Sequence, residues 1–81
     1  MLMLKTLYDL NEIEQWIRQR NGHPARVRGS KREWAIDFGG DSTSLEPLSW
    51  DQFFQGLTED HVPLLVDLEP NKRFYRFLTH G

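Results

Sequence analysis

The sequence predicts an α+β domain with the element order α-β-β-α-β-β, in which two helices pack on one face of a four-stranded antiparallel sheet. Two capped segments with apolar residues at helical spacing predict the helices. Stretches in which apolar and polar residues alternate with a period of two predict the strands. The length of 81 residues corresponds to one domain, so we expect residues 1–81 to form a single unit.

The first helix is expected to begin after Asp9, whose side chain is placed to cap it. Glu12, three residues later, would complete a capping box. Asn21 and Gly22 supply a left-handed end, and Pro24 prevents the helix from continuing. The apolar residues between these signals follow the spacing of one helical face, namely Leu10, Ile13 and Ile17, with Trp16 on the flank.

The second helix shows the same arrangement at its start. Ser49 is the expected cap, and Gln52 completes a capping box. The helical pattern fades near Asp60. The apolar face consists of Trp50, Phe53, Phe54 and Leu57.

Four strands are expected between and after the helices. Residues 25–28 alternate apolar and basic side chains, and residues 34–38 alternate large apolar residues with small or acidic ones. Residues 29–32 form the expected hairpin loop between them. The nearly continuous apolar run over 62–68 predicts a central strand, and residues 74–78 form the last strand.

The sheet face away from the helices is expected to carry side chains from three strands. Alternation places there Arg26, Arg28, Ala35 and Asp37. The last strand adds one of two sets, and the sequence leaves both open: Phe74 and Arg76, or Tyr75 and Phe77.

The composition is that of an ordinary globular domain, with 38% hydrophobic and 27% charged residues. The chain has no cysteine, which excludes disulfides, thiolate metal sites and a cysteine nucleophile. A small secreted domain usually carries disulfides, so we expect a soluble cytoplasmic protein. The N-terminal MLMLKTL lacks the features of a signal peptide, and no apolar run approaches the length of a membrane span.

The charges are divided into blocks along the chain, although the net charge is only −2. Residues 18–32 hold six basic and no acidic side chains, whereas residues 33–69 hold nine acidic and no basic ones. Such a separation produces a field that steers association with a partner of complementary charge.

The motifs together resemble a family of short bacterial proteins of about this length, whose function is uncharacterised and some of which are labelled glucan branching enzyme. The resemblance rests on the segments NEIEQW (11–16), GHPARV (22–27), IDFGG (36–40) and SWDQFF (49–54), of which the last is the most specific. It spans most of the chain and implies one shared fold. It implies no activity, because a branching enzyme needs a large barrel with paired carboxylates around a sugar, and 81 residues are too few to build one.

The sequence contains no pattern typical of catalysis, metal binding or cofactor binding. Asp37, Asp41 and Asp51 have no His or Lys spaced to complete an acid–base site, and such residues are typical of turns and helix starts. Residues 39–44 lack the frame of a phosphate-binding loop. The imidazoles lack the spacing of metal ligands, namely His23, His61 and His80. We therefore expect a non-enzymatic protein without metal or cofactor.

The strongest functional lead is a basic surface. Its candidate residues are Arg26, Arg28, Lys31, Arg32 and Arg76. With an aromatic side chain such as Tyr75, this surface would suit single-stranded nucleic acid, through phosphate pairing and base stacking. Alternatively, Glu33 and Asp37 alternate onto the same sheet face and pair with the strand arginines.

Two tryptophans are candidate contacts for another protein. Trp16 and Trp50 are expected near the seam between the helices, where exposed aromatic surface would mark a protein partner or a weak homodimer. The leading hypothesis is a small protein-interaction or accessory domain that acts through its sheet face or its charge separation. The alternative is a module that binds single-stranded nucleic acid through the basic surface.

Overall fold

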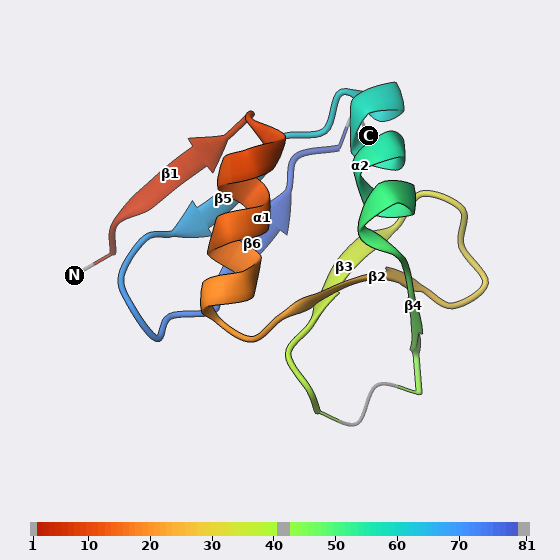
Figure 1. Ribbon diagram of the computed structural model, residues 1–81, viewed down its shortest axis with the longest axis horizontal. Coiled ribbons are helices and arrows are strands. Elements are labelled where there is room, and N and C mark those ends of the chain that lie inside the picture. Colours follow the sequence, from red (N-terminus) through yellow and green to blue (C-terminus); the bar gives the residue numbers. More distant parts are fainter. Residues whose placement is uncertain (1, 41–42, 80–81) are drawn as a thin grey trace.

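The computed structural model describes residues 2–40 and 43–79, which form two helices and two three-stranded antiparallel sheets (Figure 1). The α+β class is confirmed, but the single four-stranded sheet is wrong. The elements along the chain are β1 (Leu4–Leu7), α1 (Leu10–Gln19), β2 (His23–Val27), β3 (Trp34–Asp37), β4 (Leu45–Pro47), α2 (Trp50–Asp60), β5 (Leu64–Asp67) and β6 (Tyr75–Phe77).

Helix α1 begins and ends where its local signals place it. The Asp9 carboxylate accepts a hydrogen bond from the backbone N–H of Asn11 at 2.7 Å, which satisfies one free donor of the first turn. Glu12 does not complete the expected capping box; its carboxylate instead lies 3.5 Å from Lys5 Nζ on β1. Asn21 adopts a left-handed φ of 58° directly after the helix, as expected from the Asn-Gly pair.

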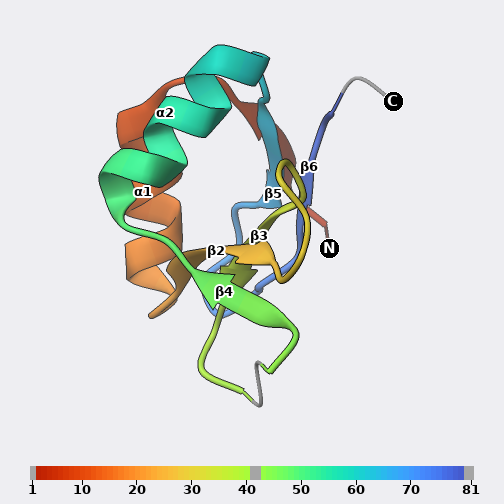
Figure 2. The ribbon, with the colours of Figure 1, turned by 90° about the vertical axis from the view of Figure 1, so that its right-hand side faces the viewer.

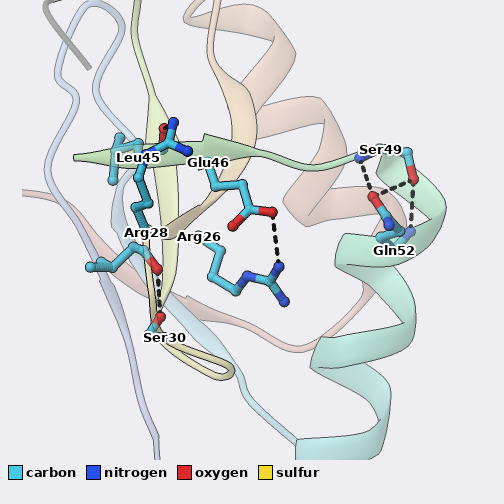
Figure 3. Close-up of polar contacts among 8 residues, drawn as sticks. Arg26, Arg28, Ser30, Leu45, Glu46, Ser49 and Gln52 are labelled. Carbon is cyan, nitrogen blue, oxygen red and sulfur yellow. Dashed lines mark hydrogen bonds and ion pairs between the residues drawn. The ribbon is translucent and has the colours of Figure 1, made fainter. Parts of the chain in front are cut away.

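Helix α2 confirms the second set of signals. The Ser49 side chain accepts from the backbone N–H of Gln52 at 3.1 Å, and the Gln52 side chain accepts from the backbone N–H of Ser49 at 3.0 Å (Figure 3). The helix ends at Asp60, and His61 follows in the left-handed conformation. Neither described helix has the length and hydrophobicity that a bilayer crossing requires.

The first sheet has the strand order β1-β5-β6. The apolar run predicted as a central strand is indeed central: β5 pairs with β1 on one side and β6 on the other. Strand β1 was not expected, because its sequence Leu-Lys-Thr-Leu shows no alternation of apolar and polar residues. It forms because Leu7 packs into the core opposite Leu64.

The second sheet has the order β3-β2-β4. The hairpin predicted from residues 25–28 and 34–38 is confirmed as the β2–β3 pair, with Ala25 opposite Ala35 and Arg26 opposite Trp34. Strand β4 was not expected, because it has three residues and ends in a proline. Proline has no backbone N–H to donate. It is tolerated here because β4 is an edge strand, which pairs with a neighbouring strand on one side only.

The core lies between the helices and the two sheets. Figure 2 shows α1 and α2 on one side of β1-β5-β6, with the second sheet closing the lower end. The buried residues come from both helices and from both sheets, namely Leu7, Ile13, Trp16, Ile17, Ile36, Phe53, Leu57, Val62, Leu64 and Val66. Leu64 and Val66 therefore face the helices, and the intervening Leu65 faces away from them.

Candidate functional site

Arg26, the first residue of the predicted basic surface, is paired within the sheet. Its guanidinium lies 3.2 Å from the Glu46 carboxylate on β4, directly across the strand pair (Figure 3). The expected pairing with Glu33 or Asp37 is wrong, because Arg26 stands opposite Trp34 and neither carboxylate shares its sheet face. The register of the β2–β3 pair decides which side chains share a face, because a shift of one residue moves every side chain of a strand to the opposite face.

Arg28 is also occupied within the fold. Its Nε donates to the carbonyl of Thr43 and its Nη2 to the carbonyl of Leu45, both at 3.1 Å. The backbone N–H of Arg28 donates to the carbonyl of Ser44 at 2.8 Å. Arg28 thus holds the segment that leads into β4, and its charged donors are engaged with carbonyls.

Of the other three basic residues, Lys31 lines one cleft together with Arg26, and Arg76 lies on the other sheet. Arg32 Nε is 3.9 Å from an Asp60 carboxylate oxygen, and Lys31 is exposed in the loop between β2 and β3. Arg76 lies in β6, in the other sheet, opposite Leu65. Arg26, Arg28 and Arg32 each have a partner within the fold, and Arg76 stands on the other sheet, which weakens the case for a nucleic-acid interface.

The three candidate aromatic residues have different environments. Trp16 is only 4% exposed and donates through its indole Nε1–H to the carbonyl of Asp67 at 2.8 Å, so it is not available to a partner. Trp50 is half-buried and stacks under the Arg18 guanidinium at 4.5 Å. Tyr75 points inward, and its hydroxyl bonds the backbone of Ile36.

A buried arginine that the sequence did not single out organises one end of the fold. Arg20 is 7% exposed and donates to the carbonyls of Trp16, Lys72 and Glu69 at 3.1, 2.6 and 2.9 Å. A fourth bond reaches the carbonyl of Asp67 at 3.3 Å. Burial lowers the pKa of Arg20, and the Asp67 carboxylate partly opposes this effect. Nothing in the sequence distinguishes Arg20 from the exposed Arg18, because three of its four carbonyl acceptors are 47 to 52 residues away.

One sheet face is open to solvent and carries large apolar side chains. We use the name outer face for Leu4, Leu65, Phe74 and Arg76, which alternation and register place on the side of β1-β5-β6 away from the helices. Leu4 and Phe74 are each 48% exposed. Figure 2 shows both helices on the opposite side of this sheet. Of the two sets that the sequence left open for the last strand, the pair Phe74 and Arg76 is the outward one.

The border of the outer face is basic. Lys72 is exposed in the turn that precedes Phe74, and Arg76 projects from the face itself, whereas the Arg73 guanidinium lies over the Phe38 ring at 5.2 Å. The nearby Asp67 is only 1% exposed, and its Oδ1 accepts from the backbone N–H groups of Met3 and Glu69. An apolar centre with accessible cations and a buried carboxylate favours a partner with an apolar patch and acidic residues around it.

Among the carboxylates and histidines considered from the sequence, His23 and Asp37 stand opposite each other across the β2–β3 pair. Asp37 Oδ1 accepts from the backbone N–H of Gly39 at 2.8 Å, and Asp51 lies in the first turn of α2. Asp41, Ser42 and His80 lie outside the described residues. Over 2–40 and 43–79, no group of three or more His, Cys, Asp or Glu side chains is arranged to hold a metal ion.

Comparison with known protein families, with curated proteins and with solved structures found no match to this chain. The geometry of the outer face and of the clefts therefore carries the functional inference.

Proposed function

We propose that this protein is a small non-enzymatic interaction domain that binds a protein partner through the outer face. The observation that carries the proposal is the pair of half-exposed residues Leu4 and Phe74 on a sheet face that no described helix covers. Exposed large apolar side chains on an uncovered sheet face are typical of interfaces, and a large aromatic side chain is a frequent binding hot spot.

The charges specify the chemistry of the partner. Arg76 stands on the outer face, and Lys72 borders it, so a partner with carboxylates around an apolar patch is favoured. Rim charges of this kind act mainly on the rate of association and on its salt dependence. We expect the complex to form faster at low ionic strength and to persist at physiological salt through Leu4 and Phe74.

The proposal is tested by photo-crosslinking from single positions in living cells. The full chain would carry p-benzoylphenylalanine at position 74, and a matched protein would carry it at position 15, an exposed site on α1. We expect position 74 to yield an adduct of one defined mass, and the charge reversal Arg76→Glu to reduce its yield several-fold. Position 15 should yield no such adduct.

Three outcomes would overturn the proposal. No adduct from position 74, or the same set of adducts from both positions, would show that the outer face has no specific partner. An adduct that nuclease treatment removes would assign the face to nucleic acid. An adduct with twice the mass of this chain would support the proposal and identify the partner as a second copy.

A further inference from the structure

A cleft of about 560 Å³ lies between the end of α2, the start of β3 and strand β6. It is separate from the outer face, because Tyr75 and Phe77 line it from the opposite side of β6 to Phe74 and Arg76. Its volume is within the range of clefts that bind small organic molecules.

Three aromatic residues line this cleft, namely Trp34, Tyr75 and Phe77. The centroids of Tyr75 and Phe77 are 5.7 Å apart, with an interplanar angle of 71°. Trp34 lines the same cleft from the start of β3. The positions of the rings are fixed, because the Tyr75 hydroxyl bonds Ile36 and Trp34 packs directly against Gly56.

The charge of the cleft is negative. Glu33 and Asp60 contribute two carboxylates, and Arg32 contributes one guanidinium. The Arg32 side chain is 79% exposed and only 3.9 Å from Asp60, so solvent screens this pair and a competing cation displaces it at little cost. Within the described residues, Glu33 forms no ion pair.

We propose that this cleft binds an alkylammonium group. Aromatic rings attract an ammonium ion through their quadrupole, and the attraction is strongest where the cation is partly removed from water. The carboxylates of Glu33 and Asp60 supply the compensating charge that a partly desolvated cation requires. This inference goes beyond the interaction proposed for the outer face and does not depend on it.

The test is a titration of the full chain with choline, followed by NMR, alongside its neutral carbon isostere 3,3-dimethylbutan-1-ol. We expect choline to shift the indole N–H signal of Trp34 and the ring signals of Tyr75 and Phe77 in a saturable manner. The isostere should bind about tenfold more weakly, since it keeps the shape but loses the cation–π and carboxylate attractions. A lysine derivative, N-acetyl-lysine methylamide, distinguishes a side chain from a free ammonium compound as the source of the group.

Two variants test whether the Asp60 carboxylate contributes to the binding of choline. Asp60→Asn is expected to weaken choline binding several-fold and to leave the isostere unchanged. Glu59→Gln is the matched control, because Glu59 is the preceding residue of α2 but does not line this cleft. If Asp60→Asn perturbs the helix end, Glu33→Gln in the loop provides an independent test of the same expectation.

Equal binding of choline and its isostere would overturn the proposal. NMR shifts confined to the signals of Trp16 or Trp50 would also overturn it, as would the absence of saturation with either compound. Equal effects of Asp60→Asn and Glu59→Gln would show that only the general charge of the protein matters. Binding of choline but not of the lysine derivative would support the proposal and restrict the ligand to a quaternary ammonium compound.

Discussion

The hydroxyl of Tyr75 bonds both backbone groups of Ile36. It accepts from the Ile36 N–H at 3.1 Å and donates to the Ile36 carbonyl at 3.4 Å. Tyr75 lies on β6 and Ile36 on β3, each an edge strand of its own sheet. One side chain therefore joins the two sheets and occupies backbone groups that an edge strand would otherwise leave open.

Tyr75→Phe is expected to destabilise the protein by about 1–2 kcal/mol, because it leaves the Ile36 N–H and carbonyl without their partner. Equilibrium unfolding in urea measures the change. Tyr8→Phe is the control: Tyr8 is 77% exposed, and its loss of a hydroxyl should change the free energy of unfolding by less than about 0.5 kcal/mol. Equal effects of the two substitutions would contradict the role assigned to Tyr75.

Arg20→Met is expected to cost roughly 2–4 kcal/mol, because four backbone carbonyls lose a charged donor at a buried position. Arg20→Lys keeps the charge but cannot reproduce the planar fork, so it should recover only part of the loss. Thermal and urea unfolding measure both. Arg18→Met, on the same helix, removes an exposed pair with Glu14 and the stacking on Trp50, and should cost no more than about 1.5 kcal/mol.

The Gly56→Ala substitution tests the packing of Trp34 on α2, because this packing decides whether the substitution raises or lowers the free energy of unfolding. In an ordinary helix interior this change stabilises the helix by up to about 1 kcal/mol. Here a Cβ at position 56 would overlap the Trp34 ring, so we expect a loss of about 1–3 kcal/mol. In a Trp34→Leu background the ring is absent, and the same substitution should be neutral or stabilising. A stabilising effect in the wild-type background would contradict the packing of Trp34 against Gly56.

Ser49→Ala is expected to cost about 1 kcal/mol, since it removes one half of the capping box of α2. Far-ultraviolet circular dichroism during urea unfolding reports the loss. Ser44→Ala provides the comparison, because Ser44 is exposed in a turn and its side chain bonds no described residue. The cap would have no energetic role if both variants unfolded at the same urea concentration.

The local signals of the sequence were sufficient to predict the helices and the hairpin. Ser49 with Gln52, and Asn21 after α1, act within three residues of the groups that they satisfy, so their effect does not depend on the rest of the chain. The same holds for the hairpin of β2 and β3. In contrast, β1 and β4 are short edge strands that form only because distant partners are present, as in the pairing of Leu4 with Asp67.

The functional surfaces could not be predicted from the alternation of residues along the strands alone. A period of two shows that Arg26 and Arg28 share a face, but it gives neither the register that sets Arg26 opposite Trp34 nor the strand that supplies Glu46. The outer face likewise required the pairing of β5 with β6, which turned Phe74 and Arg76 outward.

The sequence by itself determined the fold class, both helix starts and ends, the central position of β5 and the block structure of the charges. Only the tertiary structure decided that there are two sheets, that Arg20 is buried while Arg18 is exposed, and that Trp34, Tyr75 and Phe77 line one cleft. The physical reason is the range of the interactions. Caps and turns are satisfied by neighbours in the chain, whereas register, burial and clefts arise from contacts between segments that only folding brings together.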